Sequence, residues 1–210
     1  MKKRSAFHHG NLRNALLDGT AKLLASSGTG GFSLREAARR TGVSANAAYR
    51  HFENKEALLA ALSGRGFAQM AAEMEARMDR AGADPLGQLR ATGEAYLEFA
   101  VKEPALFELM FGPHGAGVGR DVKGTGPDTG LTPFELLARS LDRLVEAGRL
   151  SKTKRRDAEP VFWASIHGLA VLANAKVTQK RLRKKSFARL FDILLGGLGV
   201  RAARRKTRRH

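Results

Sequence analysis

Three helix-start signals follow one another within residues 33–59, and this spacing constrains the fold more than any other feature of the chain. Ser33, with Glu36 three residues later, is a capping box that predicts a helix starting directly after the serine. A glycine ends that helix, and Ser44 is a good N-cap for a second, short helix. Asn54 is placed to cap a third. A helix, a turn that contains glycine and a second short helix together form a helix-turn-helix.

The second helix of such a motif can enter the major groove of DNA. The lysine at the start of the next helix also favours a polyanionic partner. Lys55 lies in the first turn of its helix, where a cation opposes the helix dipole at a cost of roughly a few tenths of a kcal/mol. An anion bound at this helix start would remove the cost, because the ammonium and the free N–H groups would converge on it. The alternative is a solvated surface lysine.

The same residues resemble the DNA-binding domain of the tetracycline-repressor-like (TetR) family. The resemblance rests on four short runs: FHHGNLRNALL at 7–17, GVS at 42–44, YRHF at 49–52 and NKEALL at 54–59. Together these runs are far more specific than a helix-turn-helix pattern alone. The resemblance implies an all-helical, dimeric transcription regulator, usually a repressor, that a small molecule releases from DNA.

Contacts with DNA are expected mainly from the starts of the predicted helices. The first residues of the 45–51 helix should face base edges, because asparagine can bond to adenine and alanine can touch a thymine methyl group. Groups at helix starts, with one aromatic hydroxyl, suit phosphates. The expected DNA-binding residues are Ser33, Arg35, Ser44, Ala45, Asn46, Ala47, Tyr49, His51 and Lys55. The alternative for Asn46 is an exposed polar residue without a partner, and for Tyr49 a core residue with its hydroxyl at the rim.

Charge and composition agree with a nucleic-acid partner. The chain has 210 residues, enough for one large domain or two modest ones, and a net charge of +17 at pH 7. It has no cysteine, which excludes disulfides and thiolate metal sites. No apolar run approaches the roughly 20 residues that span a bilayer, and the basic start lacks the apolar segment of a signal peptide. We therefore expect a cytoplasmic protein with no membrane partner.

The remaining chain is predicted to be helical, without strand alternation or internal repeats. Helices are expected at about 12–27, 55–80, 86–102, 104–111, 133–147, from 157 or 158 to 176, and 187–199. The segment 112–133 is rich in glycine and proline and is expected to be a mobile loop. The predicted domains are a DNA-binding domain with a basic arm over 1–60, a helical ligand-binding and dimerisation domain over 61–199, and a basic disordered tail over 200–210.

Two further runs resemble the C-terminal domain of one TetR branch, named for its Trp-His-Gly pattern: WASIHGL at 163–169 and FELMFGP at 107–113. Trp163 and His167 are four residues apart and share one helix face. They either line a ligand pocket or form a satisfied core histidine beside a packing tryptophan. The expected ligand-binding residues, which line an apolar cavity unless they are plain core, are Phe99, Phe107, Met110, Phe111, Phe162, Trp163 and His167.

The sequence as a whole predicts an all-α, dimeric DNA-binding regulator that binds a near-palindromic duplex. The helices near 158–176 and 187–199 are the expected dimer interface, and a largely apolar small molecule is the expected effector. No cofactor and no metal are expected, because the six histidines lack ligand spacing. The first alternative is a constitutive basic nucleic-acid-binding protein without an effector. The second, an enzyme, lacks a nucleophile–base pair or paired carboxylates.

Overall fold

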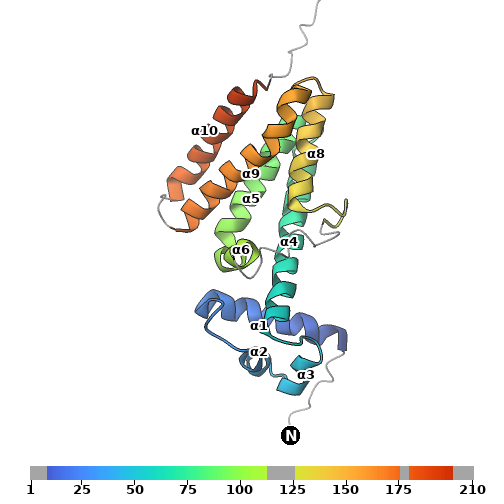
Figure 1. The fold of residues 1–210 in the computed structure, drawn as a ribbon, viewed down its shortest axis with the longest axis vertical. Helices are drawn as coiled ribbons and strands as arrows, with labels where there is room; N and C mark the ends of the chain where they lie inside the picture. Colours follow the sequence, from blue (N-terminus) through green and yellow to red (C-terminus); the bar gives the residue numbers. More distant parts are fainter. Residues whose placement is uncertain (1–8, 113–125, 176–179, 201–210) are drawn as a thin grey trace, which may run out of the picture. The chain divides into compact units, whose positions relative to one another are not determined.

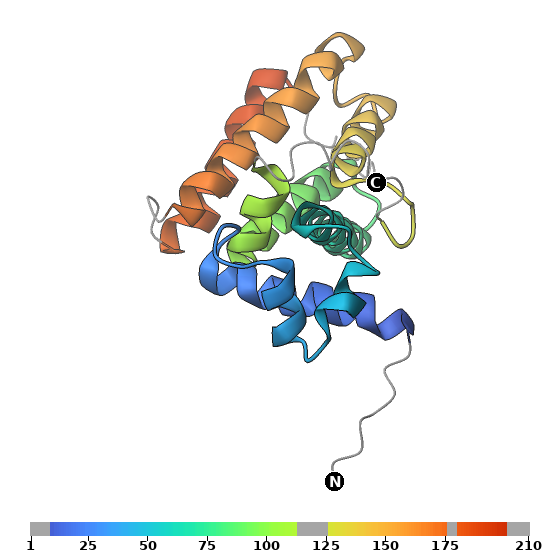
Figure 2. The same cartoon turned by 60° about the horizontal axis from the view of Figure 1, so that its bottom comes forward.

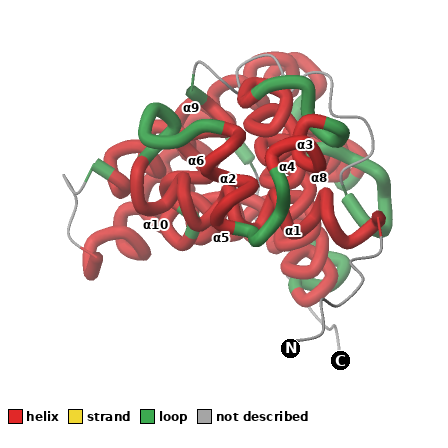
Figure 3. The backbone as a smooth tube through the Cα atoms, turned by 90° about the horizontal axis from the view of Figure 1, so that it is seen from below, coloured by secondary structure: helices red, strands yellow, loops and turns green. Residues whose placement is uncertain are grey.

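The computed structural model describes residues 9–112, 126–175 and 180–200, and every element in these ranges is a helix or a connecting loop (Figures 1 and 3). The all-helical prediction is therefore confirmed. The basic tail and nearly all of the predicted N-terminal arm lie outside the described residues, as does most of the glycine-rich segment. Within the described ranges, no helix combines the length and the apolar character that crossing a bilayer needs.

The chain divides into two compact units. The first holds residues 1–67 and 103–122, and the second holds 68–102 and 123–210. The helix α4 (Lys55–Arg80) contributes to both. Each unit has its own buried apolar residues, so each is described separately below.

The first unit contains three consecutive helices joined by short loops, and a fourth helix from later in the chain (Figure 2). They are α1 (His9–Ser27), α2 (Leu34–Arg40), α3 (Ala45–Tyr49) and α6 (Pro104–Phe111), together with the start of α4. α1 packs against α2 and α6, and α2 packs against α3. Small residues permit these close approaches. The core combines leucines with alanines, namely Leu16, Leu17, Ala37, Ala38, Ala48, Leu58 and Leu59, all at most 1% exposed.

The second unit is a helical bundle. It contains the end of α4 with α5 (Pro85–Lys102), α8 (Pro133–Glu146), α9 (Lys152–Asn174) and α10 (Lys180–Leu198). α5 packs against α8 and α9, and α10 packs against α9. Gly93 makes the α5–α9–α10 junction possible, because a Cβ atom there would lie 2.8 Å from Ile166 Cδ1 and 2.9 Å from Phe187 Cε2.

Most predicted helix starts are confirmed by their caps. Asn54 Oδ1 accepts the Ala57 N–H at 2.8 Å at the start of α4. Thr132 and Glu135 form a complete capping box at α8, since the Thr132 hydroxyl accepts the Glu135 N–H at 3.2 Å and the Glu135 carboxylate accepts the Thr132 N–H at 2.7 Å. The bond from the Thr132 N–H, followed by the contact with the Thr132 hydroxyl, lowers the pKa of the Glu135 carboxyl group.

Two helix starts and one helix end differ from the prediction. α9 begins at Lys152 rather than at 157 or 158, because Ser151 caps it by accepting the Lys154 N–H at 3.3 Å. Pro160 lies inside this helix, on its exposed side. Because proline has no N–H, the helix lacks one of its internal hydrogen bonds there. α10 begins at Lys180, since its Lys- and Arg-rich run is itself a good helix former. α3 ends at Tyr49 and not at residue 51.

The described end of the glycine-rich segment is a bonded turn rather than a mobile loop. Glu75 of α4 is only 4% exposed, and its carboxylate accepts the backbone N–H groups of Asp128 at 3.1 Å and Thr129 at 3.2 Å, together with the Thr129 hydroxyl. Gly126 donates its N–H to the Leu131 carbonyl at 2.9 Å. A buried carboxylate needs such donors. Sequence patterns do not reveal this contact, because Glu75 is more than fifty residues away.

Candidate nucleic-acid interface

The N-terminus of α2 is fixed by half of the predicted capping box. The Ser33 hydroxyl accepts the Glu36 N–H at 3.2 Å. The Glu36 carboxylate, however, accepts bonds from Arg39 at 2.7 and 2.8 Å and from Arg40 at 3.2 Å, instead of returning to Ser33. Two guanidinium groups, three and four residues further on, outcompete one backbone N–H. The bonds from Arg39 and then Arg40 lower the pKa of Glu36 to about 2.

The turn from α2 into α3 follows the pattern predicted from the sequence. Gly42 adopts a φ of +70°, which favours glycine, and Val43 donates its N–H to the Ala38 carbonyl at 2.9 Å. Ser44 then caps α3 by accepting the Ala47 N–H at 3.2 Å. Ala47 and Ala48 are buried, whereas Asn46 is exposed. One face of α3 therefore holds it to the domain and leaves the asparagine free to meet a partner.

A close approach of α1 fixes the position of α2. A Cβ atom at Gly19 would lie 2.2 Å from Thr41 Cγ2. Thr41 is not free to move away, because its hydroxyl donates to the Ala37 and Ala38 carbonyls, at 3.0 Å each. Glycine at position 19 thus lets α1 lie directly against the end of α2.

The expected DNA-binding residues occupy three kinds of position. Seven of them come from the caps or first turns of α2, α3 and α4, as predicted. Exposed are Ser33, Arg35, Ser44, Asn46 and Tyr49; partly exposed are Ala45, His51 and Lys55; buried is Ala47. Tyr49 is 45% exposed, which removes the alternative of a core tyrosine. The burial of Ala47 places its methyl group in the packing of the domain rather than on the exposed side of α3.

Lys55 has a partner that the sequence did not suggest. Its ammonium lies 5.0 Å from the centroid of the Phe32 ring, and Phe32 is 7% exposed. This cation–π contact is worth about 0.5–1 kcal/mol at an exposed site and leaves the ammonium hydrogens available for other bonds. Arg50 is a further exposed cation, beside Tyr49 at the C-terminal end of α3. Arg50 lies at a helix end, whereas the sequence signals for DNA contact mark helix starts.

Comparison with known proteins places this geometry in a family. Residues 16–62 match the model of bacterial regulatory proteins of the tetR family, and residues 89–198 match that of the tetracyclin repressor-like C-terminal domain. The chain belongs to the TetR family. It is a DNA-binding transcriptional regulator, and the fold and domains of this family are non-enzymatic.

Three solved structures have a similar fold. A protein of unknown function from Rhodococcus sp. RHA1 is 26% identical, with a TM-score of 0.77 over 93% of this chain and 100% of its own. The TetR family transcriptional regulator PfmR from Thermus thermophilus is 22% identical, with a TM-score of 0.63 over 87% and 98%. The fatty acid degradation regulator FadR from Bacillus halodurans is 16% identical, with a TM-score of 0.71 over 96% and 100%. No curated protein matched the chain.

In the second unit of this TetR-family chain, Trp163 and His167 form part of a polar and aromatic cluster. Their rings stack with centroids 5.3 Å apart, and His167 Nδ1 is 2.7 Å from the hydroxyl of Tyr96 on α5. Burial lowers the pKa of His167 and raises that of Tyr96 well above its ordinary value. Phe134 of α8 meets Trp163 edge-on at 6.3 Å. Tyr96 was not among the predicted residues, because it is seventy-one positions from His167.

The seven residues predicted to line a ligand cavity are divided between the units. Phe107, Met110 and Phe111 belong to the first unit, where Phe111 meets Phe67 edge-on at 5.4 Å. Phe99 and Phe162 belong to the second unit and are at most 1% exposed. Trp163 is 38% exposed. In the second unit, the open part of the predicted ligand-binding set is therefore the Trp163–His167 pair, and in the first unit Phe111 is partly exposed.

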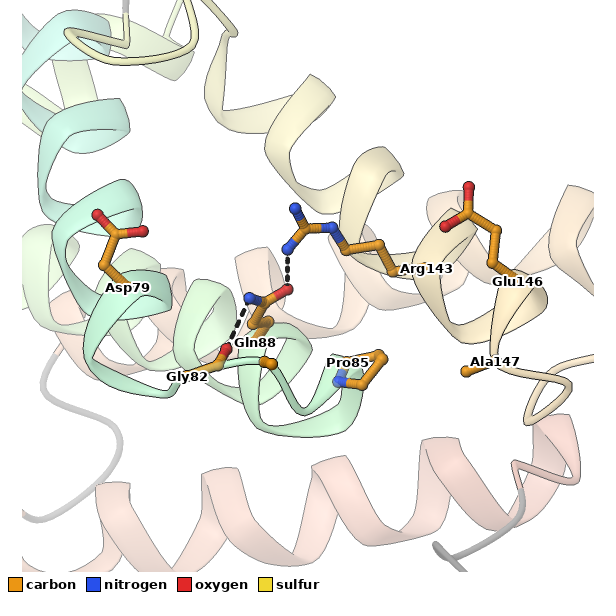
Figure 4. Close-up of a pocket in the computed structure, with 8 residues that line it drawn as sticks. Asp79, Gly82, Pro85, Gln88, Arg143, Glu146 and Ala147 are labelled. Carbon is orange, nitrogen blue, oxygen red and sulfur yellow. Dashed lines mark hydrogen bonds between the residues drawn. The ribbon is translucent and has the colours of Figure 1, made fainter.

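A separate open pocket of about 640 Å³ lies where the α4–α5 turn meets the end of α8 (Figure 4). Gln88 is buried in its wall and donates from Nε2 to the Gly82 carbonyl at 2.7 Å, while its Oε1 accepts a bond from Arg143. Asp79 and Glu146 also line it. This pocket contains none of the predicted ligand-binding residues. Among the described residues, no group of His, Asp and Glu has an arrangement suited to a metal ion.

α9 carries an apolar face that is open in the single chain. Val161, Val171 and Leu172 are 41%, 46% and 47% exposed, and the small residues Ala164 and Gly168 lie on the same side of the helix. We call these five residues the α9 apolar face. Ile193 of α10 is 70% exposed. Large apolar side chains gathered on one exposed helix indicate a protein partner.

Proposed function

We propose that this regulator binds a near-palindromic operator as a homodimer, acts as a repressor, and is released by a small, largely apolar ligand. The observation that carries the proposal is the division of α3 into a buried alanine face and an exposed face with Asn46. A short helix held this firmly, with a polar residue outward, suits the major groove. The proposed domain limits are residues 1–60 for DNA binding, 61–199 for the effector and the dimer, and 200–210 for the tail.

Each expected DNA-binding residue other than buried Ala47 receives a role from its chemistry. Asn46 makes the bidentate contact with adenine, and Ala45 touches a thymine methyl group. Arg35 reaches a guanine from the start of α2. The phosphate contacts come from helix starts and nearby hydroxyl or cationic groups: Ser33, Ser44, Tyr49, His51 and Lys55. These contacts fix the position of α3 and leave sequence preference to Asn46 and Arg35.

The proposed dimer forms through α9 and α10. The α9 apolar face supports this, because Ala164 and Gly168 let a second helix approach closely while Val171 and Leu172 supply apolar area. Two copies of α3 then lie about one helical turn of DNA apart, roughly 34 Å or a multiple, so the operator has twofold symmetry.

The proposed effector site lies at the Trp163–His167 pair. The stacked rings, the exposed part of Trp163 and the hydrogen bond between His167 and buried Tyr96 offer an apolar surface with one polar group. This combination suits a largely apolar molecule with a single hydrogen-bonding function. Because the pair flanks the α9 apolar face, a ligand there can favour one arrangement of the dimer over another.

Selection of bound duplexes from a random pool tests the DNA half of the proposal. We expect an inverted repeat, and footprints that cover both half-sites. Uniform recovery of the pool, with affinity that depends on salt alone, would support the alternative of a constitutive nucleic-acid binder. A single asymmetric half-site bound by a monomer would contradict the dimer.

Linkage tests the effector half. A ligand found by thermal shift from an apolar panel should bind more weakly to the operator complex, by the same factor by which it weakens operator binding. A coupling of about 1–3 kcal/mol, or 5–150-fold, is expected. Trp163→Ala should lower the affinity for the ligand and leave the affinity for the operator unchanged. Equal ligand affinity with and without operator would exclude that compound as an inducer.

A further inference from the structure

The partly buried arginines of the described residues differ in their partners. They are Arg65, Arg77, Arg90, Arg143, Arg149 and Arg155. All except Arg143 form an ion pair with an aspartate or glutamate, at 3.6 Å or less. Within the described ranges Arg143 has no such partner, and its side chain bonds instead to the neutral amide of Gln88. A charge removed from water is costly unless it is paired, so an anion from outside the chain gains most at Arg143.

Gln88 fixes the orientation of the Arg143 guanidinium. It is 7% exposed, and its Nε2 donates to the Gly82 carbonyl at 2.7 Å, which leaves Oε1 to accept from Arg143 Nη1. Figure 4 shows these two bonds in series, from the α4–α5 turn through α5 to α8. The bond to Gln88 uses one of the five N–H groups of the guanidinium. Because Arg143 lines the pocket, the others can bind a carboxylate through two parallel bonds.

The same pocket also has two carboxylates that Arg143 does not neutralise. Asp79 of α4 and Glu146 of α8 line it, are exposed, and form no ion pair with the described residues. Glu146 is three residues after Arg143 and therefore lies on the same side of α8. With one cation and two carboxylates, the lining has a net charge of −1 and presents both signs at separate points. Such a surface disfavours a ligand that is only negative and suits one that has both charges.

The remaining space suits a small molecule. The pocket has a volume of about 640 Å³, within the range of roughly 300–1,000 Å³ for small-molecule sites. Apart from Gln88 and the three charged residues, its lining residues are small: Gly82, Ala83, Pro85 and Ala147. They leave room for a short side chain and add little apolar area, so the charges decide which ligand binds.

We propose that this pocket is a binding site for a small zwitterion, a molecule with one carboxylate and one ammonium group, such as an amino acid. The ligand carboxylate binds the Arg143 guanidinium, and its ammonium group lies near Asp79 and Glu146. The site is distinct from the proposed effector site at the Trp163–His167 pair, because the pocket lining includes neither residue.

Four probes with five carbons each test the charge preference on the full-length protein. L-Norvaline and δ-aminovalerate are zwitterions with different charge separations, whereas valerate and pentylammonium have one charge each. Calorimetric or NMR titration at neutral pH measures each affinity. We expect at least one zwitterion to bind about tenfold more tightly than either singly charged probe. If neither zwitterion binds more tightly than valerate and pentylammonium, the proposal is wrong.

Two variants test the two ends of the ligand. Arg143→Lys keeps the cation but loses the planar fork that holds a carboxylate at two points, so zwitterion affinity should fall about tenfold. Asp79→Asn with Glu146→Gln should weaken zwitterion binding and strengthen valerate binding, so that the preference disappears. Both carboxylates are exposed, so this double variant tests the site even if Arg143→Lys lowers stability.

Two control variants locate the binding. Arg139→Lys changes an exposed arginine one turn earlier on α8 and should leave zwitterion affinity unchanged, as should Trp163→Ala. Unchanged affinity in a folded Arg143→Lys, a preference that persists in the double variant, or an equal loss in either control would overturn the proposal. No DNA enters these titrations, so their outcome is independent of the proposed operator binding.

Discussion

α3 and α9 both expose residues to solvent, but the chemistry of their exposed faces is opposite. α3 buries alanines and exposes Asn46, whereas α9 buries Phe162 and exposes Val171 and Leu172. A polar face loses nothing by remaining in water until DNA arrives. An apolar face gains by leaving water, so it favours a permanent protein partner. The difference agrees with the proposal that α3 contacts DNA and that α9 forms the dimer.

The two units also differ in the range of their polar contacts. In the first unit, the caps of α2 and α3 join residues three positions apart, as do the bonds between Glu36 and Arg39. In the second unit, the bonds from Thr129 to Glu75 and between Tyr96 and His167 join residues more than fifty positions apart. The caps of α2 and α3 are therefore specified locally, whereas these two contacts of the second unit depend on tertiary packing.

The largest expected effect comes from placing charge on the α9 apolar face. Val171→Asp with Leu172→Asp should dissociate the dimer, because burying unpaired carboxylates costs several kcal/mol, here about 3 or more. Operator affinity should fall more than a hundredfold, since a monomer contacts one half-site. Sedimentation equilibrium and operator titration measure both effects. Thr153→Asp, which adds charge elsewhere on α9, is the control. A variant that remains dimeric would locate the interface elsewhere.

The next largest effect is expected from a substitution that disrupts the packing of α1 against the end of α2. Gly19→Ala should lower the free energy of unfolding by about 1–3 kcal/mol, because the added methyl group meets Thr41 at 2.2 Å. This outweighs the helix-propensity gain of roughly 1 kcal/mol. Gly30→Ala is the matched control, since no atom lies within 4 Å of its added Cβ. Denaturant unfolding of both variants measures the difference, and equal stability would mean that α1 and α2 are not in tight contact.

Asn46 and Lys55 are expected to contribute differently to DNA binding. Asn46 should set the preference for one base pair, and Lys55 should strengthen binding to every sequence. Asn46→Ala should cost about 1–3 kcal/mol and relax preference at one base pair in each half-site. Lys55→Ala should weaken binding to all sequences and lower the salt slope by about 0.9 for each phosphate that the lysine neutralises, which is twice that for a dimer. Operator variants titrated at several salt concentrations measure both. If Lys55→Ala lowers stability and leaves the slope unchanged, the lysine serves only its contact with Phe32.

The same contrast explains which parts could be predicted from the sequence. The starts of α2, α3, α4 and α8 follow from caps that lie within a few residues of each helix, and the start of α6 follows from Pro104 at its first position. The predicted start of α9 is too late, because Pro160 favours a first-turn position, although an exposed position inside the helix also tolerates it. Two contacts could not be predicted: the bond between Tyr96 and His167 and the bond from Thr129 to Glu75. No local sequence pattern connects residues so far apart.

Acidification should act on the second unit before the first. His167 has a lowered pKa because of burial, so the folded state favours the neutral ring and the unfolded state takes up the proton first. Stability contributed by neutral His167 is present above its ordinary pKa of 6.5 and is lost as the pH falls below it. The effect is below about 1 kcal/mol, because solvent screens this half-exposed ring. His167→Gln, which keeps an acceptor for Tyr96, should flatten thermal stability between about pH 8 and 5. An unchanged pH profile would contradict this.

The smallest expected effect is the response of Glu36 to acid. Its pKa is lowered from 4.5 to about 2, chiefly by bonds from Arg39 and Arg40, so the folded state favours the carboxylate. The stabilisation is therefore complete above pH 4.5 and disappears as the pH falls towards 2. Glu36→Gln should be slightly less stable than the wild type near neutral pH, and the two should converge on acidification and in high salt, because the pairs are exposed. The same substitution frees Arg39 and Arg40 for phosphates, so DNA affinity should rise while stability falls. Parallel measurement of thermal stability and of binding to a random duplex tests this opposition. If both fall together, Glu36 holds the arginines in the position from which they contact DNA.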